Sequence, residues 1–415
     1  MRKTASLSIG QLRAFEAVSR LRSLSEAAKE LRLTQPALSR SIAKLERSLG
    51  APLLERGAAG TFPNESGLIF ERRVIRFISQ LAASLDLPNT GKRLAAERVF
   101  RIRSVHIRSL LAIWRFGSFR AAAKDLGVSE SSLHRPAREI EHIVGIKLYK
   151  RSVAGVIVTS LGAELARRFA VAMSELDSAQ DEIGISKTPR PAIRLGVLPL
   201  TPRRLLASAA ETALHQDAKR KIEIVEGSFA TLSQQVQNGD LDILFGALPT
   251  HEPDEDLIQE RLVEDPYVVV CRSDHPLLGK SNLSPTDLRG FGWIHPSDSL
   301  PRRSVIDALQ RTWDIEANVQ IETDSLLTTI SMLLSTDRIT ILSKWHVGDE
   351  SGLVELLLPP VPHTPRLVGI TSRRNWLPTP FQKTFLSLLR NELNDWRLST
   401  PASFSHKNRL HPARV

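Results

Sequence analysis

The chain has 415 residues, of which 42% are apolar and 24% are charged, a composition typical of a folded protein with two or three domains. The chain has a single cysteine, Cys271, which excludes an intramolecular disulfide and a cysteine-based zinc cluster. It has no long apolar run, which argues against export or a membrane span. The net charge of +11 is concentrated in residues 1–187, where 31 Lys and Arg stand against 18 Asp and Glu, so this half is expected to bind a polyanion.

A gapless repeat occupies much of the basic half. Residues 12–67 align with residues 107–162 at a constant offset of 95, and 17 of the 56 aligned positions are identical. Two copies are too few for a solenoid, so the repeat predicts two compact domains with the same fold.

Apolar residues in the first copy recur at steps of three and four, which predicts three short helices. Ser25 is expected to cap the second helix and Thr34 the third, whose first turn contains Pro36. The tight turn between them predicts a helix-turn-helix, with the third helix in the major groove of DNA. The residues that follow predict a β-turn wing and a long helix capped by Asn64.

The exposed side of the predicted third helix combines side chains that read bases with side chains that bind phosphate. Gln and Arg make paired contacts with adenine and guanine edges, small residues allow close approach, and Lys binds the backbone. The candidate DNA-binding residues are Ser25, Thr34, Gln35, Pro36, Ala37, Ser39, Arg40, Lys44 and Arg56.

The second copy keeps the apolar framework, but its predicted reading face differs. The residues Gln35, Pro36, Ser39 and Lys44 correspond to Glu130, Ser131, His134 and Glu139. Ser41 becomes Pro136, which lies seven residues after a predicted cap at Ser129 and is expected to kink or break the helix. Two interpretations are open. Either this copy is a degenerate reader kept for spacing, dimerisation or weak DNA contact through Arg135, Arg138 and Arg151, or both copies bind adjacent half-sites.

Residues 178–191 lose helical periodicity and gain prolines, which predicts a hinge. Beyond it, strands and helices alternate in the pattern of a parallel α/β fold, whose ligands bind where strands end and helices begin. The acidic segment 251–260 is expected to be a solvated loop. The candidate effector-binding residues are Thr201, Ser228, Arg303, Asp324 and Ser325.

Catalytic and metal-binding interpretations find no support in the residues. His275, His295 and Cys271 are not arranged at metal-ligand spacing, and the chain has neither a G-x-S-x-G elbow nor a phosphate-binding glycine loop. We therefore predict no enzyme activity, no catalytic or metal-binding residue and no cofactor.

The segment "LSEAAKELRLTQPALSRSIAKLERSLGAPLLER" resembles the DNA-binding signature of the LysR-type transcriptional regulators. The segments "EGSFATLSQQVQNGDLDILFGALP" and "EDPYVVVCRSDHPLLGKSNLSPTDLRGFGWI" resemble the effector domain of the same family, so the resemblance covers roughly residues 8–395. It implies a winged helix-turn-helix, a linker helix used for dimerisation, and a two-lobed domain like a periplasmic binding protein. The chain departs from the family pattern in having a second helix-turn-helix, and in carrying Ala59 and Ala154 where the wing often has arginine.

The predicted fold is multidomain, with two all-α winged helix-turn-helix domains at residues 1–90 and 91–187, each including a linker helix. An α/β two-lobed effector-binding domain at 188–398 and a disordered basic tail at 399–415 follow. The predicted function is a ligand-responsive, sequence-specific DNA-binding transcriptional regulator in the cytoplasm. Its expected partners are double-stranded DNA and a small effector, which is a sugar or an aromatic carboxylate. No membrane partner is expected, and the expected assembly is a homodimer or a homotetramer. The alternative is a solute-binding or scaffolding protein whose helical repeats serve only oligomerisation, and the basic excess favours DNA.

Overall fold

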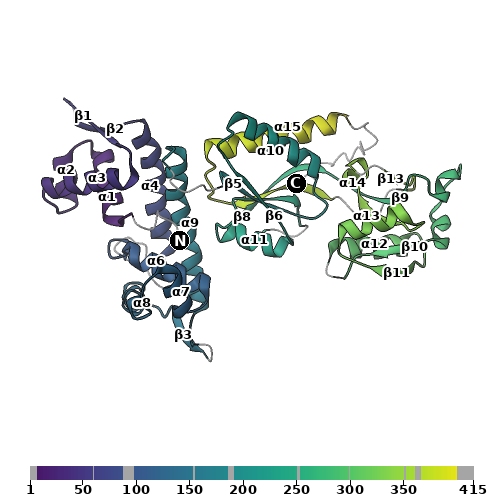
Figure 1. Cartoon of the computed structure of the whole chain (residues 1–415), viewed down its shortest axis with the longest axis horizontal. Helices are drawn as coiled ribbons and strands as arrows, with labels where there is room; N and C mark the ends of the chain where they lie inside the picture. The colour runs from purple at the N-terminus through teal and green to yellow at the C-terminus, as the bar shows by residue number, and fades with distance from the viewer. Residues whose placement is uncertain are drawn as a thin grey trace, which may run out of the picture. The chain divides into compact units, whose positions relative to one another are not determined.

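The computed structural model describes residues 7–58, 60–86, 98–152, 155–185, 191–249, 253–298, 300–349, 352–359 and 366–399. The chain forms two compact units (Figure 1). Unit 1 comprises Met1–Ala192 with Gln237–Asp240, and unit 2 comprises Ile193–Val236 with Leu241–Val415.

Unit 1 begins with a helical domain that ends in a two-stranded wing and a long helix. Its elements are α1 (Ile9–Leu21), α2 (Leu24–Glu30), α3 (Gln35–Leu49), β1 (Leu54–Gly57), β2 (Gly60–Pro63) and α4 (Glu65–Ser84). Thr34 caps α3 by accepting the Ala37 N–H at 3.3 Å, and Asn64 caps α4 by accepting the Gly67 N–H at 2.8 Å, as predicted. The predicted capping by Ser25 is wrong, because α2 starts earlier and its cap is Ser23.

The same order of elements follows a second time. These elements are α6 (Ser104–Phe116), α7 (Phe119–Leu126), α8 (Ser131–Val144), β3 (Tyr149–Ser152), β4 (Gly155–Val158) and α9 (Ser160–Glu182). One hydrogen bond shows how closely the frameworks agree. Glu46 at the end of α3 accepts the Leu53 N–H at 2.8 Å, and Glu141 at the end of α8 accepts the Leu148 N–H at the same distance.

Pro136 does not break α8, so the prediction of a break is wrong. The helix starts later than predicted, with Glu130 rather than Ser129 at its cap position, and it runs without interruption to Val144. Pro136 therefore lies in the second turn, where its missing N–H affects only the Ser132 carbonyl. Pro136 is buried, as are Leu133 and Ala137 of the same helix.

A single apolar core runs through both copies of unit 1. Phe15 of α1, Phe77 of α4, Leu110 of α6 and Phe169 of α9 are all buried members of it. A smaller cluster, around Phe119 and Leu133, belongs to the second copy alone. The two copies therefore share one core rather than forming two independent cores.

The first lobe of unit 2 is a five-stranded sheet with helices on both faces. The strand order is β6-β5-β7-β14-β8, with β5 (Ile193–Val197), β6 (Ile222–Glu226), β7 (Ile243–Ala247), β8 (Leu257–Glu264) and β14 (Leu367–Arg373). In β7, Ile243 and Phe245 face the core beneath α10 (Arg203–Gln216) and α15 (Pro380–Ser399), whereas Leu244 faces α11 (Phe229–Gln237). This alternation follows from the period of two in a strand.

The second lobe of unit 2 is built around β9. This strand lies between β12 and β13 and is antiparallel to both, and a parallel pair, β10 and β11, flanks them. The strands and helices of this lobe are β9 (Tyr267–Arg272), β10 (Gly292–His295), α12 (Pro301–Thr312), β11 (Asn318–Glu322), α13 (Leu326–Ser335), β12 (Thr340–Ser343), α14 (Lys344–Asp349) and β13 (Leu353–Glu355). The 3-10 helices η2 (Pro276–Gly279) and η3 (Pro285–Gly290) precede β10. The chain enters this lobe after β8 and leaves it after β13, so two segments connect the lobes.

Three further expectations are corrected. The sheet of the first lobe is mixed rather than parallel, because β14 is antiparallel to both β7 and β8. The segment predicted as a solvated loop becomes β8 from Leu257 onward, and its Glu260 forms a two-point ion pair with Arg390 at 2.8 Å. The predicted hinge begins later than expected, since α9 continues to Glu182.

Some predicted features lie outside the described residues. These are the wing positions Ala59 and Ala154 and the basic tail at 400–415. Across the described part of the chain, none of the helices combines the length and the apolar character that crossing a membrane requires.

Candidate nucleic-acid interface and effector site

The helix α3 has one buried side and one exposed side. Leu38, Ile42, Leu45 and Leu49 are buried in the core of unit 1. On the other side Gln35, Pro36, Arg40 and Lys44 are exposed, while Ala37 and Ser39 are half-buried. The predicted reading face therefore lies on one side of one helix, as binding in a major groove requires.

Two of the predicted DNA-binding residues are in direct contact across the helix-turn-helix. The Ser25 hydroxyl of α2 donates to Oε1 of Gln35 on α3 at 3.4 Å. This contact leaves the amide nitrogen of Gln35 available, so the side chain is positioned as a donor. Ser25 thus belongs to the reading face, although it does not cap α2.

The predicted cationic DNA-binding residues of the first copy, Arg40, Lys44 and Arg56, are exposed. Arg40 donates from Nε to the Pro36 carbonyl at 3.3 Å, which extends its side chain along α3 and leaves the terminal nitrogens of the guanidinium exposed. Lys44 lies one turn further along, and Arg56 lies on wing strand β1 opposite Thr61. The structure therefore places cations on both the helix and the wing of this copy.

The corresponding face of α8 is occupied by an ionic cluster. Glu139, in the position of Lys44, accepts from His106 Nε2 at 2.9 Å and from Arg135 Nε at 2.8 Å, and it also pairs with Arg103. Hydrogen bonding from His106 and Arg135 lowers the pKa of Glu139 to about 2, so it remains a carboxylate. Arg138 on α8 and Arg151 on β3 are exposed.

Two predicted effector residues lie at helix starts in the first lobe of unit 2. Thr201 is fully buried, and its hydroxyl donates to the Leu198 carbonyl at 2.5 Å. Ser228 accepts the Thr231 N–H at 3.2 Å at the start of α11. Both hydroxyls therefore have partners within their own lobe.

The other three predicted effector residues lie in the second lobe. Asp324 accepts from the backbone N–H and the hydroxyl of Ser297 at 2.8 and 2.7 Å, and Ser325 caps α13. Arg303 faces carboxylates instead of an open site, because it bonds to Asp307 at 3.1 Å and to Glu322 at 3.3 Å. Its charge is already balanced within the lobe.

The adjacent arginine points inward and joins a cationic cluster that the sequence did not indicate. Arg302 is 5% exposed and donates to the Ile341 carbonyl at 3.3 Å. Arg366 bonds to the Leu200 carbonyl at 2.7 Å and pairs with Asp265. Burial, together with the nearby Arg366, Arg203 and Arg302, lowers the pKa of His346 to about 4. Of these three arginines, Arg203 is paired with Glu226 at 3.2 Å and Arg366 with Asp265.

This cationic cluster draws on both lobes and lies beside two of the predicted effector residues. Arg203 begins α10 in the first lobe, and Arg302 belongs to α12 in the second. Arg366 holds the carbonyl next to Thr201, and Arg302 interacts electrostatically with Asp324. Arg302 and Arg303 are adjacent on α12 and differ in the side of the helix on which they lie. The sequence alone does not show which of the two points inward.

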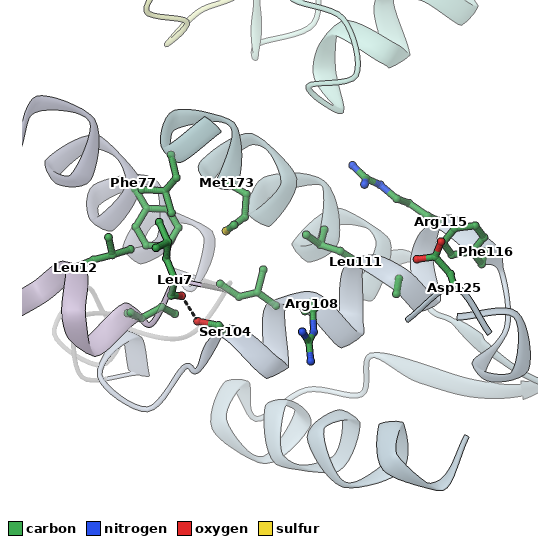
Figure 2. Close-up of a pocket in the computed structure, with 14 residues that line it drawn as sticks. Leu7, Leu12, Phe77, Ser104, Arg108, Leu111, Arg115, Phe116, Asp125 and Met173 are labelled. Atoms are coloured by element: carbon green, nitrogen blue, oxygen red, sulfur yellow. Dashed lines mark hydrogen bonds between the residues drawn. The ribbon is translucent and has the colours of Figure 1, made fainter. Parts of the chain in front are cut away.

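A cavity of about 160 Å³ lies within unit 1, between the two copies (Figure 2). Leu7, Leu12, Phe77 and Met173 contribute apolar walls, and Arg115 lies at one end. A cavity of this size holds a molecule about as large as benzene. It is therefore too small for a sugar or a substituted aromatic acid, and none of the predicted effector residues lines it.

Comparison with known proteins identifies the class to which this architecture belongs. The family described as "LysR substrate binding domain" matches residues 186–394. The family described as "Bacterial regulatory helix-turn-helix protein, lysR family" matches residues 9–68 and 105–163. The chain therefore belongs to the LysR family of bacterial transcriptional regulators, and it combines a helix-turn-helix part with a substrate-binding domain.

Individual relatives agree with this assignment. The chain is 25% identical over 394 residues to the HTH-type transcriptional regulator GalR of Pseudomonas putida, a match that covers 93% of this chain and 97% of the relative. It is 27% identical over 289 residues to PcaQ of Agrobacterium fabrum, covering 67% and 91%. Among solved structures, a full-length OxyR variant from Pseudomonas aeruginosa is similar with a TM-score of 0.49 and 17% identity, covering 70% of this chain and 94% of that one.

Proposed function

We propose that this regulator carries a duplicated winged helix-turn-helix and reads its operator chiefly with the first copy. Duplication is supported by equivalent details in the two frameworks. Gly67 and Gly162 lie at equivalent positions, and a Cβ there would lie only 2.0 Å from the Leu53 carbonyl and 2.4 Å from the Leu148 carbonyl. Both sites require glycine because the backbone passes so close.

The observation that carries the functional proposal is the contrast between the exposed sides of α3 and α8. On α3, Arg40 and Lys44 are exposed. On α8, Arg135 is bound by the carboxylate that replaces the lysine. DNA presents phosphates and electronegative base edges, so it favours the first face and repels carboxylates on the second.

The proposed domains are residues 1–90 and 91–187 for the two helix-turn-helix copies and 188–398 for the effector domain, which has two lobes and two connecting segments like a periplasmic binding protein. The proposed assembly is a homodimer or homotetramer in the cytoplasm.

A gel-shift titration on random promoter fragments at two salt concentrations tests DNA binding. We expect selective binding that weakens steeply with salt, and binding insensitive to salt would contradict the proposal.

For the effector, we propose a small anion, such as an aromatic carboxylate or an acidic sugar, held between Thr201 and Asp324. Support comes from Arg302 of the second lobe, which is buried and interacts electrostatically with Asp324, and from Arg366, which bonds to the carbonyl next to Thr201. A carboxylate accepts paired hydrogen bonds from guanidinium groups.

A thermal-shift screen of anions, followed by calorimetry, tests this site. A ligand that binds only the folded state raises the melting temperature. Arg302→Gln should weaken binding of a hit at least tenfold, whereas Arg303→Gln, the neighbour whose charge is already balanced, should change it little. Equal losses in the two variants would place the ligand elsewhere.

A further inference from the structure

The two long helices that follow the wings, α4 and α9, pack against each other within one chain. Arg72 of α4 bonds to Glu182 near the end of α9, whereas Gln80, further along α4, bonds to Glu175, which precedes Glu182. The helices are therefore antiparallel. Both helices bury equivalent positions in one core, since Phe70, Val74 and Leu81 correspond to Leu165, Phe169 and Leu176 at the offset of 95.

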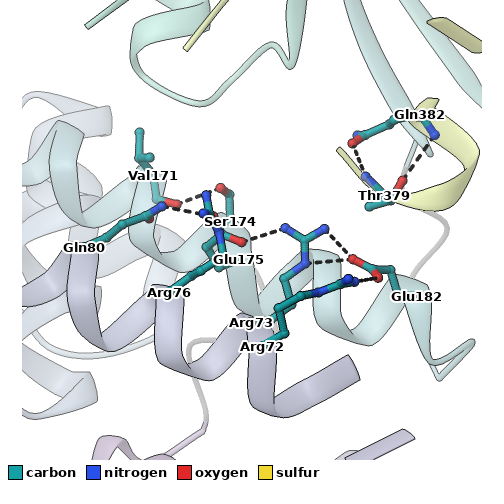
Figure 3. Close-up of polar contacts among 10 residues, drawn as sticks. All are labelled: Arg72, Arg73, Arg76, Gln80, Val171, Ser174, Glu175, Glu182, Thr379 and Gln382. Atoms are coloured by element: carbon teal, nitrogen blue, oxygen red, sulfur yellow. Dashed lines mark hydrogen bonds and ion pairs between the residues drawn. The ribbon is translucent and has the colours of Figure 1, made fainter. Parts of the chain in front are cut away.

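The charges in this pairing are divided unequally between the two helices (Figure 3). Arg73 is 1% exposed and donates to Glu175 at 2.7 Å and to Glu182 at 2.7 Å. Arg76 donates to Glu175 at 2.9 Å. In these contacts all the cations are on α4 and all the carboxylates are on α9.

The equivalent positions show why α4 is not suited to pair with another α4. At the offset of 95, Glu175 corresponds to Gln80 and Glu182 corresponds to Leu87. If two α4 helices packed in the same geometry, the Arg73 of each would be buried opposite Gln80 and Leu87 of the other. Neither of these residues carries a carboxylate. A buried guanidinium without a counter-charge is strongly destabilising, so this pairing is disfavoured.

The equivalent arginine of α9 has no such role. Arg168 corresponds to Arg73, but it is 43% exposed and is held by Glu164 of its own helix at 2.6 Å. Pairing α9 with another α9 would leave α4, with its buried arginine, without a partner. The arrangement that satisfies both helices is the pairing of α4 with α9, and the covalent connection between the copies favours the pairing within one chain because it raises the effective concentration of one helix near the other.

We propose that one chain is a complete pair of DNA-binding heads, in which α9 occupies the face of α4 that would otherwise take a second molecule. Two unlike recognition helices, α3 and α8, are then fixed to the ends of one helix pair. The DNA site contacted by one chain is accordingly asymmetric, with one side read through Gln35 and Arg40 and the other contacted weakly. This inference rests on the proposed duplication and on the proposed DNA binding.

Cross-linking tests the helix pairing without DNA. The full-length protein carries Gln80→Cys and Glu175→Cys, at positions whose wild-type side chains meet at 3.0 Å, and is treated at high dilution with a short reagent that joins two thiols. Cys271 is buried, and burial raises its pKa to about 12, so it does not compete. Each single-cysteine variant serves as a control.

We expect nearly all of the double variant to form an internal cross-link that migrates as one chain at every protein concentration. A covalent dimer, or no reaction, would overturn the proposal. Native mass spectrometry on the shortest DNA fragment that binds, at a dilution at which the proposed homodimer or homotetramer dissociates, is expected to detect a complex with one chain. A strict requirement for two chains on that fragment would also overturn the proposal. If no DNA fragment binds, the proposed function fails while the cross-linking result stands by itself.

Discussion

Arg135 donates from Nε to Oε1 of Glu139 at 2.8 Å, one turn apart on α8. In the first copy the same two positions are Arg40 and Lys44, both exposed cations. One change from lysine to glutamate therefore removes one positive charge from the second recognition helix and neutralises another. In our proposal the weaker DNA contact of this copy is electrostatic in origin, because the helix itself remains intact.

Replacing Glu139 by Gln should release Arg135 and strengthen DNA binding. We expect affinity on all sequences to rise several-fold at low salt, because a freed guanidinium contacts phosphate and a repelling carboxylate is removed. A gel-shift titration measures this change.

The control for that experiment is Glu130→Gln, which removes the same charge from the same helix without releasing an arginine. The Glu130 variant should strengthen binding less. Equal gains would show that only the net charge of α8 matters and that Arg135 does not reach the DNA.

Arg40 and Arg135 provide a direct comparison of the two copies. Arg40→Ala should weaken the specific site by about 1–3 kcal/mol and relax the preference at one base position. Arg135→Ala should weaken the specific site much less, because Glu139 already neutralises this guanidinium. Equal losses on the same operator would show that both copies read DNA.

Lys44 is expected to act differently from Arg40, through phosphate rather than through a base. Lys44→Ala should weaken binding to all sequences by a similar factor and lower the slope of log affinity against log salt by about one. Titrations on a specific and a random fragment at three salt concentrations measure both effects. A loss confined to the specific fragment would instead make Lys44 a base-reading residue.

The helix-turn-helix framework could be predicted from the sequence because its determinants are local. The cap at Thr34, the cap at Asn64 and the apolar steps along α3 act within one or two turns, and the structure contains all three features. Ser25 was misassigned because Ser23 and Ser25 are both suitable caps, and only the packing of α2 selects the first.

The remaining features depend on contacts between residues far apart in the chain. No local signal shows that Arg73 pairs with Glu175 and Glu182, since more than 100 residues separate the partners. Arg302, His346 and Arg366 are far apart in the chain, so no local signal shows that their charges interact. Pro136 is buried within α8, and neither this burial nor the later start of the helix is visible in the sequence.

The buried ion pairs of Arg73 can be compared with a matched arginine on the equivalent helix. Arg73→Met should lower the free energy of unfolding of unit 1 by about 3 kcal/mol, because it leaves buried carboxylates of α9 without their main partner. Arg168→Met, at the equivalent position, should cost less than about 1 kcal/mol, since this arginine is exposed. Denaturant unfolding followed by circular dichroism measures both values. Similar costs would mean that the charge on α4 does not stabilise the pair.

His346 should make the stability of unit 2 depend on pH. Its pKa is about 4 in the folded protein and about 6.5 when unfolded, so between these values the unfolded chain binds a proton that the folded chain does not. Stability should therefore be fully present above about pH 6.5 and should fall as the pH is lowered toward 4, by about 3 kcal/mol in total. In His346→Asn this part of the pH dependence should be absent. Only the wild type then loses this stability as the pH is lowered, so the difference in melting temperature between wild type and variant should shrink from pH 7.5 to pH 5. A difference that stays constant over this range would show that His346 is protonated equally in both states, and that the surrounding arginines do not suppress its charge.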